Sequence, residues 1–390
     1  MIKLNKVIFL LIITLISCKK EDKEQLIVDK KIEMIKVNPI GYKEMKPREI
    51  LSENVEYIPL ETTTISTIGK IDRIQIFEGN YFITDKRNAK GIYIFNSKGN
   101  FINKISPFGK GPHEITFMDD ILYNKITKQI EIFDSARKKI LVYDVNGEFI
   151  KEFDTKVYLN SFYPIAENER YYYTGFRSFK GMLDIDKNYR LLKMNEEADL
   201  LNSFFRYSDS QANQKIVELQ NNFFPIDNSD KVFFLEPYSN NVYELKRDSV
   251  ILKYKLNFTN ANIPDDLLES DENGKQGLKK HDFVLKQSGA LLNNILFEDT
   301  EELIFWYIKD VYRELHYNKK NKEYYEFSSY FVTDDNIYLP MNHYVAKEFS
   351  LSIIEPMNLL NGKINYSRRI QKILEGKKST DNPIIVKIKR

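Results

Sequence analysis

The chain of 390 residues contains a single cysteine, Cys18, one tryptophan and four histidines. One thiol cannot form a disulfide within the chain and cannot by itself build a thiolate metal site. The histidines are scattered, at His113, His281, His316 and His343, and no His-Glu-x-x-His pair is present. We therefore expect no metal site and no cofactor.

A surplus of charge of either sign is also missing. The 58 lysines and arginines oppose 56 aspartates and glutamates, which leaves a net charge of +2, and the basic residues form no long block. Proteins that bind nucleic acid normally carry a marked basic excess. We therefore expect no nucleic-acid partner.

Catalytic signatures are equally scarce. The sequence contains no Gly-x-Ser-x-Gly turn of the kind that exposes a serine nucleophile. The segment Gly109-Lys110-Gly111 lacks the Lys-Ser/Thr pair that opens a helix in a phosphate-binding loop, and Pro112 leads toward a strand instead. We assign no catalytic residue from the sequence.

The one strongly apolar run, Val7–Ser17, lies at the N-terminus and ends at Cys18. A membrane-spanning helix needs about 20 apolar residues, and this run is shorter. The segment Leu15-Ile16-Ser17-Cys18 resembles a bacterial lipobox, which implies that residues 1–17 are a lipoprotein signal peptide and that Cys18 is acylated. An ordinary signal peptide or a membrane anchor is the alternative.

Residues 18–47 are interpreted as the lipidated cysteine and a tether to the folded domain. Within them, Lys20-Glu21-Asp22 resembles the short signal that sends lipoproteins of the Bacteroidetes to the outer face of the outer membrane. The resemblance implies a surface-exposed outer membrane lipoprotein, held at the membrane through its N-terminal lipid. Attachment to the periplasmic leaflet is the alternative.

The remaining sequence is rich in β-forming aromatic residues and contains an internal repeat. Hydrophobic residues make up 42% of the chain, with 25 tyrosines and 26 phenylalanines, which indicates a globular and β-rich domain. Two predicted hairpins, 91–105 and 139–153, share an outline in which Gly99 and Gly147 occupy the turns, 48 residues apart. Glycine accepts the positive φ that tight hairpin turns require.

The repeat has four predicted strands in roughly 50 residues, which is the unit of a β-propeller blade. Each hairpin follows a further pair of short apolar runs. Weaker copies of the hairpin occur at 191–204, 242–254 and 312–327. Five blades are thus predicted. A sixth takes its inner strands from 330–333 and 336–339 and its third strand from 384–389, and the N-terminal strand 55–60 closes it.

We therefore predict an all-β fold over residues 48–390, a six-bladed β-propeller with four-stranded blades. Short helical insertions interrupt the propeller. Helical spacing predicts one insertion at about 260–292 and a C-terminal helix at about 364–376.

Three segments are the most recognisable parts of the chain: Val55–Thr62, Phe108–Ile115 and Asp381–Val386. Through them the chain resembles the six-bladed β-propeller lipoproteins of the Bacteroidetes, which are related to NHL-repeat propellers. His113 stands where that pattern has a second glycine, and only the first two repeats match the pattern well. The resemblance implies architecture and compartment, and it supplies no catalytic motif to transfer.

Propeller geometry predicts where a ligand site lies. The loops between the second and third strands of each blade, and those between blades, meet on one face around the central channel. Residues in these loops form a candidate ligand rim: Asp85, Arg87, His113, Asp134, Arg137, Arg177, Tyr238 and His343. The alternative is that these are solvated turn residues. Trp306 is interpreted as blade packing rather than as a platform for a sugar.

The sequence therefore favours a lipid-anchored cell-envelope propeller that acts as a non-catalytic binding module for a glycan, a peptide or a protein. The rival interpretation is a propeller enzyme, a lyase or hydrolase, with its site at the central channel. A structural subunit of an envelope complex is a third interpretation.

Overall fold

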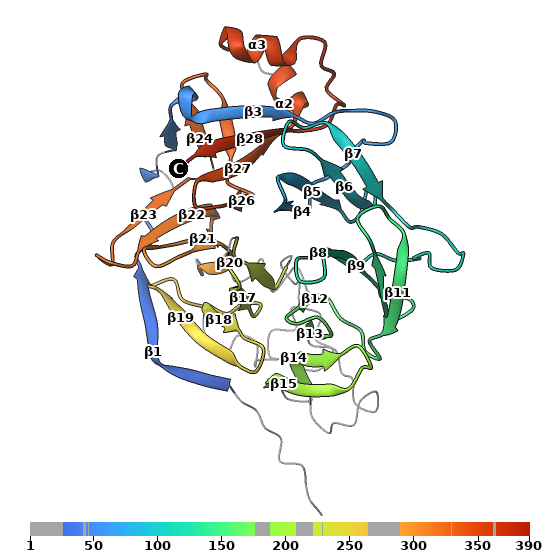
Figure 1. Ribbon diagram of the computed structural model, residues 1–390. Helices are drawn as coiled ribbons and strands as arrows, with labels where there is room; N and C mark the ends of the chain where they lie inside the picture. Colours follow the sequence, from blue (N-terminus) through green and yellow to red (C-terminus); the bar gives the residue numbers. More distant parts are fainter. Residues whose placement is uncertain are drawn as a thin grey trace, which may run out of the picture.

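Seven β-sheets surround a common centre in the computed structural model (Figure 1). The structure describes residues 26–41, 44–45, 47–175, 188–207, 221–227, 229–263, 289–328, 330–361 and 364–390. Neighbouring strands of the large blades pair antiparallel, except for one parallel pair in the fourth blade, and the blades follow one another around the ring in chain order. The predicted all-β propeller is confirmed, but the prediction of six blades was wrong, because the structure has seven.

The first three blades each contain four consecutive strands. The first is formed by β4 (Arg73–Phe77), β5 (Asn80–Asp85), β6 (Gly91–Phe95) and β7 (Phe101–Ile105). The second is formed by β8 (Asp120–Asn124), β9 (Gln129–Asp134), β10 (Lys139–Tyr143) and β11 (Phe149–Asp154). The third is formed by β12 (Ser161–Pro164), β13 (Glu169–Tyr173), β14 (Asn188–Asn195) and β15 (Leu200–Tyr207).

Three of the remaining four sheets include a strand from the N-terminal part of the chain. The fourth contains β16 (Phe223–Pro225), β17 (Val232–Leu235), β18 (Asn241–Leu245), β19 (Val250–Phe258) and β1 (Leu26–Val37). The fifth contains β20 (Leu291–Glu298), β21 (Glu302–Lys309), β22 (Val311–Asn318) and β23 (Tyr324–Phe327). A short sheet contains β2 (Arg48–Ile50), β24 (Tyr330–Thr333) and β25 (Tyr338–Pro340). The closing blade contains β26 (Tyr344–Val345), β27 (Phe349–Ile354), β28 (Ile384–Lys389) and β3 (Val55–Pro59).

The hydrophobic core lies between neighbouring blades. One cluster, for example, joins Phe82 and Ile94 of the first blade to Ile121 and Leu141 of the second. Strands β6 and β8 are buried along their whole length, which explains why they are continuous apolar runs in the sequence rather than alternating ones. Burial of each such side chain stabilises the fold by about 1.5–3 kcal/mol. The inner strands are thereby held in place around the centre.

The N-terminal strand closes the ring as the sequence predicts. β3 pairs antiparallel with β28, and Ile58 lies opposite Ile385. The pairing covers the outer edge of β28, which would otherwise expose unpaired amides and carbonyls.

The correction to the blade number concerns β24 and β25, which the sequence analysis assigned to the inner strands of a sixth blade. They pair instead with β2, in which Ile50 lies opposite Thr333, and form the short seventh sheet. Phe331 and Leu339 of this sheet pack against Ile354 and Val386 of the closing blade. Its apolar residues are thus buried without joining that blade, whose first strand is β26.

The predicted tether is also wrong for Leu26–Val37. These residues form β1, which pairs parallel with β19 and extends the fourth blade to five strands. Ile35 and Val37 are 1% and 0% exposed and join the cluster that contains Leu256 and Phe258. The apolar residues at alternate positions of β1 match the open edge of β19, so this segment belongs to the propeller.

The helical segments are few and short. A 3-10 helix, η2 (Ser52–Asn54), precedes β3, and the helices α2 (Pro356–Leu360) and α3 (Arg368–Leu374) lie between β27 and β28. α3 falls within the predicted range 364–376, and α2 was not predicted. Most of the helical insertion predicted at 260–292 lies outside the described residues, as do residues 1–17 and Cys18. No helix among the described residues is long and apolar enough to cross a membrane.

Candidate binding site in the central channel

The inner strands enclose a cavity of about 160 Å³ at the centre of the ring, here called the channel cavity. Its wall is formed by β4, β8, β12, β16, β20 and β26, by Trp306 of β21, and by residues just before or just after some of these strands. Six blades therefore contribute to one site. A cavity of this size has room for several waters or for a small ligand.

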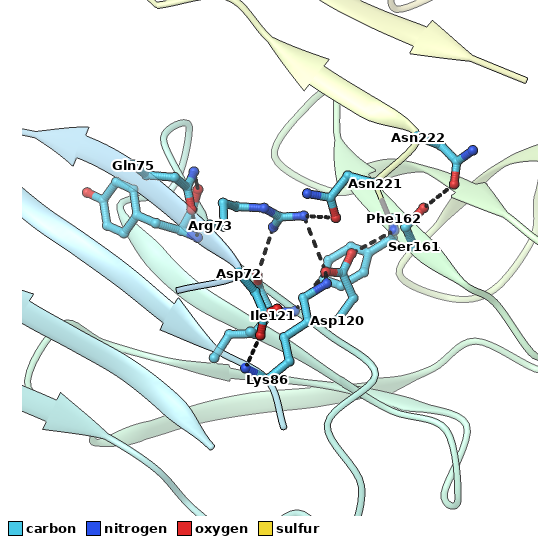
Figure 2. A network of polar contacts seen from close by, with 11 residues as sticks. Asp72, Arg73, Gln75, Lys86, Asp120, Ile121, Ser161, Phe162, Asn221 and Asn222 are labelled. Carbon is cyan, nitrogen blue, oxygen red and sulfur yellow. Dashed lines mark hydrogen bonds and ion pairs between the residues drawn. The ribbon is translucent and has the colours of Figure 1, made fainter. Parts of the chain in front are cut away.

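A polar network at one end of the channel cavity joins four blades (Figure 2). Arg73, the first residue of β4, donates to Asn221 Oδ1 at 2.7 Å and contacts Asp120 Oδ1 at 3.4 Å. Lys86 Nζ donates to the same oxygen of Asp120 at 2.7 Å, and the amide of Phe162 donates to Asp120 Oδ2 at 3.3 Å. The N-terminal ends of β4, β8, β12 and β16 thus meet here, and we call these five residues the channel mouth.

Asp120 is fully buried at the channel mouth, and both of its carboxylate oxygens accept hydrogen bonds. Burial alone would raise the pKa of Asp120, but Lys86 and Arg73 beside it hold the pKa below its usual range. Burial lowers the pKa of Lys86 in turn, although Asp120 opposes this effect. A carboxylate held in this way positions its neighbours and is not available to take a proton from a ligand.

Asn293 enters the channel cavity from a β-bulge. Across the pairing of β20 with β21, Leu292 lies opposite Tyr307 and Asn294 opposite Trp306, so Asn293 is an extra residue with no counterpart. A bulge of this kind redirects a side chain. Asn293 is only 9% exposed, lines the cavity, and has no hydrogen-bond partner for Nδ2 among the described residues. An unpaired buried donor costs about 1–3 kcal/mol, which an acceptor in the cavity would offset.

Aromatic rings form much of the remaining wall. The indole of Trp306 donates to Glu314 Oε2 at 3.1 Å, which fixes the orientation of the ring. The ring of His343 lies edge-on to it, with 6.2 Å between ring centroids. Further aromatic side chains line the same cavity: Phe162, Tyr163, Phe223, Phe224 and Tyr344.

His343 supplies a neutral imidazole to the channel cavity. Its burial among the surrounding wall residues lowers its pKa to about 4, against a hydrogen bond with the backbone of Met341 that raises it. The residue as a whole is nevertheless exposed to solvent. His343 therefore carries no charge near neutral pH and can donate or accept a hydrogen bond.

Two of the predicted rim residues, Asp85 and Asp134, bind the backbone of their own blades. Asp85 is buried at the end of β5 and accepts from the amides of Gly69 and Lys70 at 2.8 and 2.9 Å. Burial alone would raise the pKa of Asp85, but the surrounding amide donors hold the pKa below its usual range. Asp134 ends β9 in the same way and accepts from the amide of Thr116 at 2.8 Å. The structure therefore places both carboxylates in the turns and not at an open rim.

His113 lies in the connector between the first two blades, and Arg137, in the turn between β9 and β10, binds this connector. Arg137 donates to the carbonyl of Glu114 at 2.8 Å and to Glu152 Oε2 at 3.0 Å. His113 has a φ of 62°, in the left-handed region that favours glycine, and its ring stacks on Phe149 with 3.7 Å between centroids. This conformation explains why a glycine is expected at this position.

The other predicted rim residues are dispersed. Arg87 is exposed, and Arg177 lies outside the described residues. Tyr238 is buried and lines a smaller cavity of about 20 Å³, which shares two asparagines with the channel cavity. Only His343 of the described rim residues lines the channel cavity itself.

Arg73, Asn221 and Asn293 were not predicted from the sequence, because they lie on the inner two strands of a blade or, for Asn221, just before an inner strand, and not in the loops considered for the rim. Trp306 packs against a cluster that contains Leu296 and Val345, as predicted, and it also lines the channel cavity. Alternating polar residues on a first strand, such as Arg73 and Gln75, are the signal that could have identified the wall of the cavity.

The site offers hydrogen bonds and aromatic surfaces. Within the described ranges, histidine, aspartate and glutamate side chains form no group of three or more that could hold a metal ion. The arrangement of amides, rings and paired charges suits the binding of a polar organic ligand.

Comparison with solved structures supports the propeller architecture. The chain is similar to a protein of Bacteroides fragilis described as exported, with a TM-score of 0.70, 16% sequence identity, and coverage of 92% of this chain and 100% of that one. It is also similar to a DUF4221 family member from Bacteroides vulgatus, with a TM-score of 0.52, 10% identity, and coverage of 89% and 98%. At such identities the similarity shows the fold alone.

Comparison by sequence gives the family. No curated protein matches the chain. The family described as "Domain of unknown function (DUF4934)" matches residues 36–389, which is most of the chain and begins within β1. The chain belongs to the DUF4934 family.

Proposed function

We propose that this protein is a non-catalytic binding module whose ligand enters the central channel. The observation that carries the proposal is the unpaired Nδ2 of Asn293, which a bulge directs into a cavity lined by six blades. A rigid ring with an unsatisfied donor at its centre is suited to holding a ligand in one orientation.

The state of the charged groups supports binding rather than catalysis. A general acid or base must exchange a proton with its substrate. The charged side chains at the cavity are instead paired with one another, Asp120 with Lys86 and Arg73 at one end and Asp227 with Lys125 at 3.3 Å elsewhere in the wall. Such pairs fix the shape of the wall.

His343 is the observation that favours the rival, a lyase or hydrolase. A neutral imidazole in the channel cavity can accept a proton, and the low pKa of about 4 keeps it neutral. If the protein is an enzyme, His343 is its general base. Substitution His343→Ala would then abolish product formation while ligand binding persists.

We further propose that the propeller is anchored through a lipid on Cys18 at the outer membrane, exposed at the cell surface. The lipobox-like sequence supports this proposal. The direction of β1 fits it, because Leu26 pairs with Val250 at the start of β19. β19 runs opposite to β16, so Leu26 lies at the end of the blade away from the channel mouth. The eight residues from Cys18 to Leu26 can span at most about 28 Å, so the mouth would face away from the membrane.

Two experiments test these proposals. A screen of the full chain against glycans and peptides, with product analysis of every ligand that binds, should find binding without turnover. Release of a product that depends on His343 would establish the enzyme instead.

Labelled palmitate should enter the wild-type protein and not Cys18→Ala, and labelling of both would show that Cys18 is not the acylated residue.

A further inference from the structure

The charged side chains that line the channel cavity cancel one another. They are Asp72, Arg73, Lys125 and Asp227, two of each sign. Arg73 contacts Asp120 at 3.4 Å, Lys125 contacts Asp227 at 3.3 Å, and Asp72 contacts a lysine at 3.1 Å. Each of these lining charges already contacts an opposite charge, and Arg73 shares Asp120 with Lys86. A charged ligand would therefore gain little in this wall to offset its loss of hydration.

Besides the ring of His343, the open hydrogen-bonding groups of the cavity include two carboxamides. Asn221 Oδ1 is occupied by Arg73, which leaves its amide nitrogen to donate, and Asn293 Nδ2 has no partner among the described residues. Gln75 is different, since both ends of its amide bind the backbone of Tyr123. Asn221 and Asn293 line both the channel cavity and the adjoining smaller cavity. The site thus presents neutral donors to a ligand that carries acceptor oxygens.

The aromatic wall supplies the complementary apolar contact. Trp306 is held by Glu314 through its ring nitrogen, so its ring cannot turn away from the cavity without breaking that bond. The pairing of Trp306 with Asn294 sets it next to the bulge that carries Asn293. A flat ring beside amide donors is the combination that receives a ligand with an apolar face and a rim of hydroxyl groups.

We infer that the channel cavity takes a neutral polyhydroxylated ring, a single uncharged sugar residue either free or at the end of a longer glycan. Its hydroxyl oxygens accept from Asn293 and Asn221, and its carbon-bound face packs on Trp306. The inference rests on the proposed binding function and adds the chemical class of the ligand. A peptide or an anion is the alternative ligand, and the titration described next distinguishes either of them from a sugar.

Trp306 makes the test direct, because it is the only tryptophan of the chain and it lines the cavity. The full chain is titrated with uncharged mono- and disaccharides, with glucuronate and phosphate as charged probes and with short neutral peptides, while the Trp306 fluorescence is recorded. We expect a saturable change with an uncharged saccharide. Substitution Asn293→Ala should weaken that binding about tenfold, the loss of one buried hydrogen bond.

The matched control is Asn103→Ala, which removes a half-buried asparagine that bonds the turn at Val145 on the outer side of the first two blades. It should bind as the wild type does. Trp306→Phe should remove the fluorescence signal, and calorimetry should show weaker but measurable binding. Unfolding curves confirm that each variant folds, and Asn221→Ala replaces Asn293→Ala if the latter does not.

The possible results separate the ligand class from the binding function. Binding of a peptide or an anion that weakens in Asn293→Ala, with no response to any saccharide, would overturn the inference and leave the channel as a binding site. Saccharide binding that is unchanged in both asparagine variants would overturn the inference and the proposed location together. The absence of a saturable fluorescence change with every probe would also overturn the inference.

Discussion

Asp120 connects three blades through its two oxygens, which bind Lys86, Arg73 and the amide of Phe162. Substitution Asp120→Ala leaves two cations without a counter-charge inside the protein. We expect the free energy of unfolding to fall by about 3–5 kcal/mol, measured by urea denaturation.

The control for this prediction is an exposed ion pair. Glu78 contacts Lys128 at 3.1 Å with both side chains mostly in solvent. Glu78→Ala should therefore cost less than about 1 kcal/mol. Similar losses for the two variants would show that the channel mouth does not hold the blades together.

His316 provides a pH-dependent contribution to stability. It lies 3.0 Å from Glu302 and 2.8 Å from Glu314. Burial alone would lower the pKa of His316, but the two carboxylates raise it above its usual value. The protonated ring therefore stabilises the fold fully below about pH 6.5, and this contribution is lost as the pH rises through the higher folded-state pKa.

The measurement compares the free energy of unfolding of the wild type with that of His316→Gln across the pH range. The advantage of the wild type should shrink as the pH rises above about 6.5. Comparison of the two proteins cancels the opposite effect of His343, whose lowered pKa is common to both. An advantage that does not change with pH would contradict the prediction.

Individual residues of the site were only partly predictable from the sequence. His343 was found because it lies in a loop next to an inner strand. Asn293 was not found, because its direction depends on a bulge in the pairing of β20 with β21, and an apolar pattern does not specify that register. Asp85 was assigned to the rim because a sequence does not show which backbone amides surround a carboxylate.

Among the elements, the hairpin turns differ in how tightly they are packed. Gly99 and Gly147 occupy equivalent turns with φ of 85° and 91°. A Cβ on Gly99 would lie 2.4 Å from the carbonyl oxygen of Pro59 in the closing strand β3, whereas on Gly147 the nearest atom, on Ile105, is 3.6 Å away. Alanine therefore strains the backbone at both sites and overlaps the neighbouring blade only at Gly99.

We expect Gly147→Ala to lower the free energy of unfolding by about 1 kcal/mol, the cost of positive φ. Gly99→Ala should lower it by about 2–4 kcal/mol, since the overlap with Pro59 adds to that cost. Urea denaturation of both variants measures the difference. Equal losses of unfolding free energy in the two variants would show that β3 shifts at little cost to relieve the overlap at Pro59.

Most strands could be predicted, but not all of their partners. The alternating and continuous apolar runs identified β4 to β11 and the closure by β3, because burial on both faces leaves a strong pattern. β1 and the pair β24 and β25 were assigned to the wrong places. An apolar run indicates that a strand is buried. The sheet to which the strand belongs depends on which sheet edge is free to pair with it.

At the scale of the whole molecule, anchoring through Cys18 predicts how the propeller is oriented on the membrane: the channel mouth faces away from it. Lys110 lies in the connector before β8, on the face of the channel mouth, and Lys128 lies in the turn between β8 and β9, on the opposite face. Both side chains are exposed. If Cys18 is acylated, a cysteine placed at either position is the only free thiol.

A bulky maleimide reagent applied to intact cells should therefore modify Lys110→Cys faster than Lys128→Cys. The membrane should shield the thiol of Lys128→Cys from the reagent. Equal rates in cells, with equal rates also in the detergent-solubilised protein, would contradict the proposed orientation.

The proposed function requires that the ligand is held at the centre of the ring. Hydrogen–deuterium exchange of the full chain, with and without the ligand found by titration, tests this location most directly. We expect slower exchange in the inner strands 73–77 and 291–298 when the ligand is bound. Protection confined to the outer strands 101–105 and 149–154, with the inner strands unchanged, would contradict it.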